Sequence, residues 1–433
     1  MEPIVTTVYG RISGVEDSNS YVYKGIPYAK PPVEELRFKA PQRLEKWEGI
    51  YKADSFKTMS VQMGEKPSSF YGKEFFSLKD FPVPEKSEDC LYLNVWTPKE
   101  KGKYPVAIWY HGGGFVGGYS FEPEFDGDDF ASKGIILVTV SYRLGMLGTF
   151  CHPSLRDENG ISGNYGFRDM IAAIDWVKEN IASFNGDPED ITIFGQSAGG
   201  MAIRTLVTSP CVKGKIKKAI IQSCNGYKGP LKVDFTMEEM EKIGERFLKL
   251  KRLNIEKLKQ ITDIDKLIRL QSEYNLYCSF KTHASLNFNP TVDGKYLPVS
   301  PDTALEKDEV AKVNYMVGCM KDDIGSSKES KTDPNKSPIL KSLMNWAMMN
   351  NEHGNDSYCY YFAHDLPGDD SGAFHSGELW YVFHTLDRSW RPFNEYDHQL
   401  ADRVSDIWAS FIKRGDPGWE RCTKENSYYE TID

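Results

Sequence analysis

The stretch that most constrains the fold is the pentapeptide at residues 195–199, Gly-Gln-Ser-Ala-Gly. The four residues before it, Ile-Thr-Ile-Phe, are apolar and mostly β-branched, which predicts a buried strand. The residues from Gly200 to Leu206 predict the start of a helix. A strand, a sharp turn carrying serine and a helix form the context that exposes a serine as a nucleophile. We therefore predict that Ser197 is a catalytic nucleophile, flanked by glycines that avoid collisions on the tight turn.

A run of glycines, His-Gly-Gly-Gly-Phe at residues 111–115, follows a second buried-strand pattern at 106–110. Consecutive glycines leave backbone N–H groups bare enough to contact a substrate oxygen. Acyl transfer requires such donors, because its tetrahedral intermediate carries an oxyanion and losing one donor costs about 3–4 kcal/mol of barrier. We predict that the N–H groups of Gly113, Gly114 and Ala198 form this oxyanion hole.

Composition excludes several classes of protein. The chain has 433 residues and a net charge of −9, which argues against a nucleic-acid partner. No run approaches the roughly 20 apolar positions of a membrane helix, and residues 1–5 lack the features of a signal peptide. The eight cysteines show neither a C-x-x-C pair nor zinc spacing, so we expect no metal and no cofactor. Monomer and dimer both remain open.

Further motifs extend over almost the whole chain: Gly-Ile-Pro-Tyr-Ala-Lys-Pro-Pro at 25–32 with Leu-Arg-Phe at 36–38, Ser-Glu-Asp-Cys-Leu-Tyr-Leu-Asn-Val at 87–95, Asn-Tyr-Gly-Phe-Arg-Asp at 164–169 and Gly-Asp-Pro at 186–188. With the glycine run and the serine motif, they make the chain resemble the type-B carboxylesterases. This branch of the α/β-hydrolases includes bacterial carboxylesterases and the cholinesterases, and we expect a bacterial source.

The resemblance implies an α/β-hydrolase fold: a mostly parallel sheet with helices on both faces, an N-terminal antiparallel ribbon and a helical cap insertion. We expect one domain over residues 1–433, with a cap-like insertion at about 230–312 and a shortened excursion at about 326–358. Strands predicted from apolar runs alternate with helices in agreement with this fold, at 92–97, 106–110, 135–141, 218–222 and 313–317. Short N-terminal strands are expected at 4–13 and 20–24.

Chain order in this fold places the acid and then the histidine after the serine. His375, in Gly-Ala-Phe-His-Ser-Gly-Glu at 372–378, resembles the catalytic-histidine loop of the family. Three other histidines compete by position but lack this context: His364, His384 and His398.

The acid is expected in Val-Gly-Cys-Met-Lys-Asp-Asp-Ile-Gly at 317–325, a segment that resembles the one where the family usually has glutamate. Asp323 aligns with that glutamate, and Asp322 is the alternative. An aspartate can hold the imidazole tautomer and stabilise the imidazolium charge, although its shorter side chain demands a small adjustment of the backbone.

Several segments carry structural expectations. Residues 55–86 are loop-like and rich in aromatic residues, which either line the active-site mouth or pack the loop onto the core. Residues 326–337 are polar and predict a mobile loop. Residues 235–275 predict charged helices with one apolar face, formed by Met240, Ile243, Phe247 and Leu250. The resemblance implies two structural ion pairs, Arg37 with Glu88 and Arg143 with Asp169.

Two cysteines are informative. In secreted relatives the cysteine that matches Cys90 resembles one half of a disulfide to an earlier cysteine, but no cysteine precedes Cys90 here. An unbridged set fits a reducing compartment, and we expect a cytoplasmic protein. Cys224 stands where relatives often carry glycine, and we interpret it as a buried structural thiol near the site.

Together these features predict a serine hydrolase that cleaves carboxylic esters, with short to medium acyl groups or aryl groups, through an acyl-enzyme. The expected partner is a small-molecule ester, with neither nucleic acid nor membrane involved. One alternative is a catalytically weak scaffold or adhesion protein of the same fold, against which the presence of Ser197 and His375 argues. Another is an amidase or peptidase with the same triad.

Overall fold

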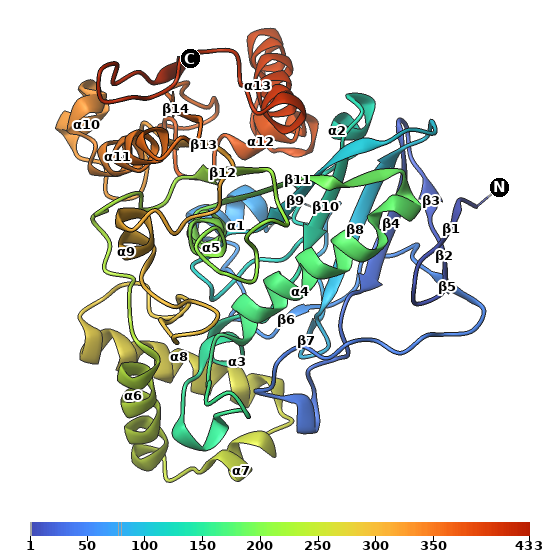
Figure 1. The fold of residues 1–433 in the computed structure, drawn as a ribbon, viewed down its shortest axis with the longest axis vertical. Helices are drawn as coiled ribbons and strands as arrows, with labels where there is room; N and C mark the ends of the chain where they lie inside the picture. Colours follow the sequence, from blue (N-terminus) through green and yellow to red (C-terminus); the bar gives the residue numbers. More distant parts are fainter. Residues whose placement is uncertain (1, 77, 79) are drawn as a thin grey trace.

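The computed structural model of the protein describes residues 2–433 apart from 77 and 79, and within these residues ten strands form one large sheet (Figure 1). In spatial order the strands are β15 (Glu430–Ile432), β14 (Ser357–Phe362), β13 (Asn314–Met320), β12 (Lys218–Gln222), β11 (Gly186–Gln196), β9 (Tyr104–Tyr110), β10 (Ile136–Val140), β8 (Tyr92–Pro98), β4 (Ser20–Pro27) and β3 (Val15–Glu16). Neighbours from β15 to β10 pair in parallel. The strands β8, β4 and β3 extend the sheet with antiparallel pairs, so the mostly parallel sheet is confirmed.

The central strand β9 shows why the sheet needs cover on both faces. Val106 and Ile108 belong to one buried core, whereas Ala107 and Trp109 between them belong to another. Successive side chains of a strand point to opposite faces, so a strand that is apolar at every position must be buried on both.

Helices supply that cover (Figure 1). On one face α4 (Tyr165–Asn180) packs through Met170 and Ile174, and on the other α13 (Glu395–Arg414) packs through Val404 and Trp408. The remaining α-helices are α1 (Phe70–Phe75), α2 (Asp128–Ser132), α3 (Gly145–Thr149), α5 (Ala198–Leu206), α6 (Met237–Leu250), α7 (Ile255–Lys259), α8 (Ile264–Thr282), α9 (Pro301–Glu306), α10 (Lys328–Thr332), α11 (Pro338–Glu352) and α12 (Leu379–Val382). Within the described residues, no helix combines the length and hydropathy that crossing a bilayer requires.

The N-terminal region forms the expected antiparallel pair, β1 (Ile4–Thr6) with β2 (Arg11–Ser13), and β5 (Ile50–Lys52) joins β2 in parallel. A second small sheet pairs β6 (Met59–Ser60) with β7 (Lys86–Ser87). The two expected ion pairs are confirmed. Arg37 Nε donates to Glu88 at 2.6 Å, and Arg143 donates to both Asp169 oxygens at 2.7 and 2.8 Å.

Two segments expected to be loops contain short helices instead. Residues 55–86 include α1, whose first turn is capped by Ser69, which accepts from the Gly72 N–H at 2.9 Å. Residues 326–337 include α10, which begins with a capping box between Ser327 and Ser330. Because a serine side chain can satisfy free N–H groups at a helix start, each segment forms a helical turn that is too short to show a helical periodicity in the sequence.

The apolar face expected on α6 is correct except at its end. Met240 and Phe247 are buried, but Leu250 is 66% exposed. The leucine that is buried in this helix is Leu248, which directly follows Phe247. Leu250 is the last residue of α6, where the helix ends.

The carboxyl ends of the parallel strands gather the predicted site residues. The glycine run follows β9, Ser197 follows β11, Asp323 comes shortly after β13, and His375 lies beyond β14. These four strands lie in the parallel part of one sheet, so their carboxyl ends meet at one edge, where ligands of open α/β sheets bind.

Candidate active site

Ser197 occupies the sharp turn between β11 and α5, with φ of 57° and ψ of −121°. Residues other than glycine rarely adopt this backbone conformation. The backbone strain that results is typical of functional sites. The flanking glycines are required by close approach. A Cβ on Gly199 would lie 2.0 Å from the carbonyl oxygen of Tyr110, and one on Gly195 would lie 2.6 Å from the carbonyl carbon of Gly199. The turn therefore packs directly against β9.

The structure brings His375 and Asp323 together. His375 Nδ1 lies 2.5 Å from Asp323 Oδ1, and both side chains are buried. Burial alone would disfavour the charge on each. The attraction between the two outweighs burial, so the pKa of His375 is raised above its usual 6.5 and the pKa of Asp323 is lowered. The carboxylate accepts from the Nδ1–H, which leaves Nε2 as the free nitrogen of the neutral ring.

Asp322 faces away from His375. It forms an ion pair with Lys331 at 2.5 Å and accepts from the Ala373 N–H at 3.0 Å. The other three histidines each pair with an acid away from the serine: His364 with Asp397, His384 with Asp402, and His398 with Asp387.

His375 Nε2 lies 3.2 Å from the amide nitrogen of Gln196. Among the described residues, the partner of His375 Nε2 is therefore Gln196 and not the Ser197 hydroxyl. Ser197 lines the same cavity as His375 and Gln196. Hydrogen bonds between a nucleophile and its base are often long or poorly aligned in a free enzyme and tighten when substrate binds.

The glycine run forms the turn that the sequence suggested. Gly113 and Gly114 have φ of 94° and 62°, and a Cβ on Gly113 would lie 2.2 Å from the Gly117 carbonyl oxygen. Both glycines line the cavity that contains Ser197. Within the described residues, the N–H groups of Gly113, Gly114 and Ala198 have no protein acceptor, so they are free for a ligand oxygen.

Gly113, Gly114, Ser197 and His375 line a cavity of about 720 Å³. Its wall is largely apolar, and the apolar lining includes Phe75, Phe76, Val116, Met201, Leu231, Leu286, Phe288, Ile339 and Leu379. Cys224 also lines it, and burial raises the pKa of this thiol to about 12, so it stays protonated. From α8, the side chains of Gln271, Ser272 and Asn275 complete the wall.

Two buried glutamates line the same cavity. Burial raises the pKa of Glu122 to about 7, and the pKa of Glu124 lies well above its usual value for the same reason and because Glu122 is close. Glu122 also accepts from the Tyr119 N–H at 2.7 Å. Two carboxyl groups that lie close together resist being ionised at the same time. This part of the wall therefore carries less negative charge at neutral pH than two fully ionised glutamates would.

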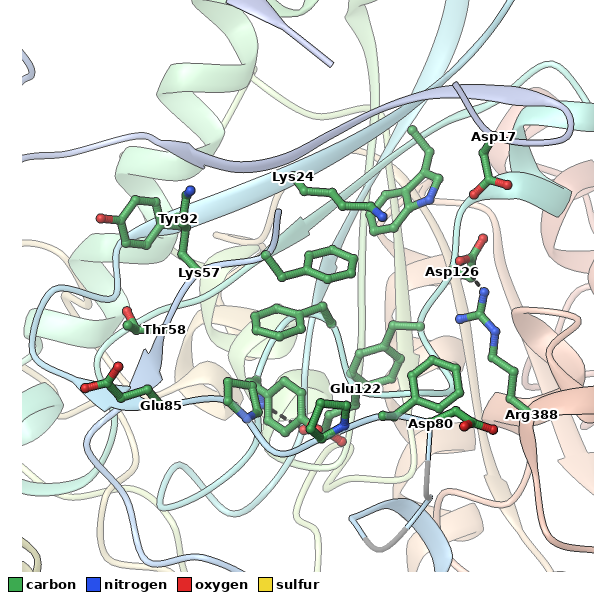
Figure 2. A pocket seen from close by; sticks show the side chains of 18 of the residues that line it. Asp17, Lys24, Lys57, Thr58, Asp80, Glu85, Tyr92, Glu122, Asp126 and Arg388 are labelled. Carbon is green, nitrogen blue, oxygen red and sulfur yellow. Dashed lines mark hydrogen bonds and ion pairs between the residues drawn. The ribbon is translucent and has the colours of Figure 1, made fainter. Parts of the chain in front are cut away.

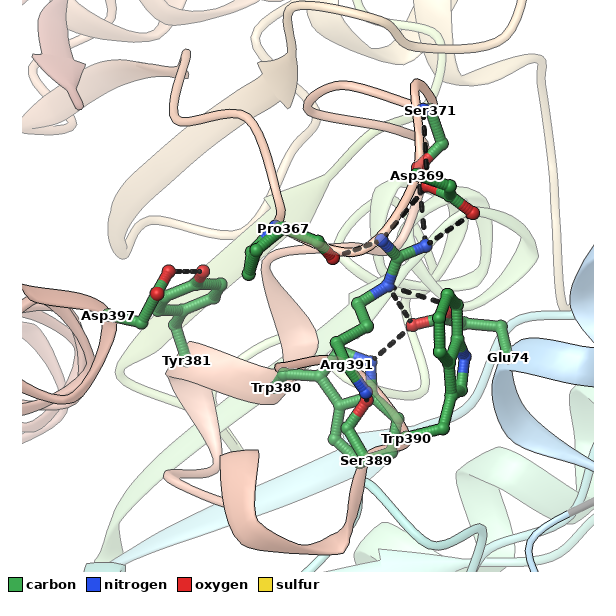
Figure 3. Close-up of polar contacts among 10 residues, drawn as sticks. All are labelled: Glu74, Pro367, Asp369, Ser371, Trp380, Tyr381, Ser389, Trp390, Arg391 and Asp397. Atoms are coloured by element: carbon green, nitrogen blue, oxygen red, sulfur yellow. Dashed lines mark hydrogen bonds and ion pairs between the residues drawn. The ribbon is translucent and has the colours of Figure 1, made fainter. Parts of the chain in front are cut away.

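The helix α1 supplies Tyr71 and Phe75 to the cavity and is fixed by a buried ion pair (Figure 3). Glu74 accepts from Arg391 Nε at 2.8 and 3.0 Å and from the indole N–H groups of Trp380 and Trp390. Figure 3 shows that the same guanidinium also contacts Asp369, at 3.1 Å. This cluster joins the α1 segment to the chain that follows His375.

Figure 2 shows a second cavity, also of about 720 Å³. It shares Tyr119, Glu122 and Phe125 with the first, but neither Ser197 nor His375 lines it. Stacked rings of Phe56 and Phe121, 4.5 Å apart, form part of its wall. Charged side chains of both signs surround it: Asp17, Lys24, Lys57, Asp80, Glu85, Asp89, Asp126 and Arg388. The predicted triad residues therefore line the first cavity and not the second.

Sequence reasoning missed two parts of the site. Gln196 lies inside the serine motif at a variable position, so nothing in the motif indicated its contact with His375. Glu74 and Arg391 are separated by more than 300 residues and have no local pattern, so only the folded chain brings them together. Within the described residues, no group of three or more His, Cys, Asp or Glu side chains is placed to hold a metal ion.

Comparison with known proteins places the chain among esterases. A family model described as the carboxylesterase family matches residues 1–345 and 335–433. A para-nitrobenzyl esterase of Bacillus subtilis is 32% identical over 99% of this chain and 93% of its own length. A liver carboxylesterase of Sus scrofa is 35% identical over 75% of this chain and 59% of its own length. A solved PNB esterase structure has a TM-score of 0.85 at 28% identity, covering 100% of this chain and 96% of that one.

The relatives support catalysis rather than a non-catalytic scaffold, because their names describe ester-hydrolysing enzymes. The match to the solved PNB esterase extends over the full length of this chain. The chain therefore belongs to the carboxylesterase family, and it is an α/β-hydrolase that hydrolyses carboxylic esters by serine chemistry.

Proposed function

We propose that Ser197, His375 and Asp323 form the catalytic triad of this esterase and that Gly113, Gly114 and Ala198 form its oxyanion hole. The observation that carries the proposal is the convergence of Ser197, His375, Asp323 and the two glycines, from four separate strand ends, on one apolar cavity. Ala198 directly follows the serine that lines it. The 2.5 Å contact between His375 and Asp323 supplies the oriented base, and the strained turn presents the serine.

The reaction follows from these positions. His375 Nε2 takes the hydroxyl proton of Ser197 as its oxygen attacks the ester carbonyl carbon, and Asp323 stabilises the imidazolium that forms. The three free N–H groups hold the oxyanion of the tetrahedral intermediate. The C–O bond to the alcohol then breaks, and the alcohol leaves with the proton from His375. Water, deprotonated by the same histidine, attacks the acyl-enzyme and releases the acid and the serine.

The substrates proposed are small-molecule esters with short to medium acyl groups or aryl groups. The support is a largely apolar cavity of about 720 Å³, within the range of sites that enclose molecules of drug size. The net charge of −9 supports a function without nucleic acid, and the mechanism requires no membrane. Eight free cysteines support a reducing compartment, the cytoplasm.

The test is hydrolysis of p-nitrophenyl esters from acetate to long acyl chains, with Ser197→Ala and His375→Ala measured in parallel. We expect turnover of short and medium esters and a loss of at least about 10⁴-fold in kcat for each variant, as for triads in general. A p-nitroanilide with the best acyl group is the control for amide cleavage. A folded wild type that is inert on every ester, or an active Ser197→Ala, would overturn the proposal.

A further inference from the structure

Gln196 lies at a position where it acts directly on the catalytic base. It is the last residue of β11 and is 2% exposed, and its amide nitrogen lies 3.2 Å from His375 Nε2. We propose that Gln196 is a positioning residue that holds His375 as the neutral base, by donating its amide N–H to Nε2 in the free enzyme. The proposal rests on the proposed function, because it assumes that His375 is the base of the triad.

The direction of the hydrogen bond follows from the other side of the ring. Asp323 occupies His375 Nδ1, so the neutral ring carries its proton there and offers a lone pair at Nε2. Gln196 must then present its NH₂ group to Nε2 and its oxygen elsewhere. The oxygen indeed lies against the glycine run, where a Cβ built on Gly112 would be 3.1 Å from Gln196 Oε1. Gly112 therefore leaves the space that this amide occupies.

A donor at Nε2 favours the neutral ring, because an imidazolium has a proton on that nitrogen and cannot accept. The Ser197 hydroxyl requires the same lone pair for catalysis, so amide and hydroxyl alternate on one nitrogen. Gln196 thus keeps the ring oriented and uncharged until the nucleophile takes its place.

The two carboxyl groups that face His375 favour the opposite, charged state of the ring. Asp323 follows β13, and Glu378 lies three residues beyond His375; both carboxyls raise the pKa of His375. From α1, the Tyr71 hydroxyl donates to the His375 carbonyl oxygen at 3.3 Å and is neutral. Among the described residues, Gln196 is the group that donates a hydrogen bond to the ring at Nε2.

The experiment measures the pH profile of kcat/KM for p-nitrophenyl butyrate in wild type, Q196M and Q196E. Methionine keeps the volume but removes the donor, and we expect the acid limb to move up by about 0.5–1 pH unit. Glutamate adds a carboxylate beside the ring, and we expect an upward shift of at least about one pH unit. At the alkaline plateau, both variants should stay within about tenfold of wild type, because a neutral ring is then present in all three.

The matched control is Q62E, which places a carboxylate on the wall of the same cavity, where Gln62 is hydrogen-bonded to the backbone of Gly118 and not to His375. Its acid limb should move less than that of Q196E. A second readout is the pH dependence of the rate of inactivation by an organophosphate. This rate depends on the protonation state of the base, but it involves no deacylation step.

Superimposed acid limbs in wild type, Q196M and Q196E would overturn this inference while leaving the triad intact, provided that Ser197→Ala is dead. Should Q196E fail to fold, Q196M alone decides the question. An inert wild type would instead count against the proposed function.

Discussion

Asp322 and Asp323 are adjacent in the sequence but have different partners. Asp323 accepts from His375 and is buried beside it, whereas Asp322 contacts Lys331 and the backbone of Ala373. Backbone hydrogen bonds fix the difference, because the Met320 and Ile324 N–H groups both donate to Asp323. The carboxylate is therefore held before substrate arrives.

These two residues offer a matched pair of variants. Asp323→Asn keeps the volume but removes the charge that stabilises the imidazolium and favours the wrong tautomer, so we expect kcat to fall by about 10⁴-fold. Asp322→Asn should lower kcat far less, since its partners lie outside the site. The measurement is kcat on p-nitrophenyl butyrate with far-UV circular dichroism as the folding check. Equal losses in the two variants would contradict the assignment of Asp323.

The charge on His375, the proposed base, sets the pH dependence that we expect of the wild type. Burial opposes that charge, but the Asp323 carboxylate outweighs it, so the pKa of His375 lies above 6.5. The general base must be neutral, so activity is lost as the pH falls through this pKa and is full above it. We expect the acid limb of kcat/KM to have its midpoint above pH 6.5. A midpoint at or below pH 6.5, measured at constant ionic strength, would show that the effect of burial outweighs the attraction of Asp323.

At the scale of elements, α1 depends on one buried ion pair for its position. The Glu74 and Arg391 side chains are 1% and 0% exposed, and the pair joins α1 to the segment before α13 (Figure 3). A lone buried carboxylate is costly, so we expect Arg391→Met to lower the free energy of unfolding by about 3–5 kcal/mol. Urea unfolding followed by circular dichroism measures this loss. The KM should also rise, since α1 lines the cavity.

A double variant separates the ion pair from simple loss of packing. Glu74→Met combined with Arg391→Met removes both charges, and its loss should be smaller than the sum of the two single losses. Strict additivity would mean that the pair is not coupled. Lys30→Met, in the exposed pair with Glu45, serves as the control and should leave the unfolding midpoint unchanged.

The same scale shows where sequence patterns failed. Apolar runs such as 106–110 and 218–222 correctly predicted strands, because burial on both faces leaves a continuous signal. The helices α1 and α10 have serine caps but span only six and five residues, so periodicity gave no indication of them. Leu250 continues the apolar spacing of α6, yet its side chain is 66% exposed. Periodicity predicts which face is apolar, not how far the neighbouring surface extends.

For the whole molecule, the order of the strands explains why so much of the site could be predicted. Ser197 and the glycine run are local motifs that follow recognisable strands, and the chain order of the fold then narrowed the choice to His375 and Asp323. The contact of Gln196 with His375 joins residues 179 positions apart, and that of Glu74 with Arg391 joins residues 317 apart. Such contacts depend on three-dimensional packing and leave no spacing in the sequence.

The thiols provide a prediction about the whole molecule. All eight cysteines are free, and seven are buried, while Cys211 is half-buried. Burial raises the pKa of the Cys151 and Cys278 thiols to about 12, which leaves little reactive thiolate. We expect Ellman's reagent to modify about one thiol per folded chain, at Cys211, and all eight in guanidinium chloride without a reductant. Cys211→Ser should remove the fast reaction and leave esterase activity intact. Fewer than eight thiols after unfolding would reveal a disulfide and contradict the reducing compartment proposed for this enzyme.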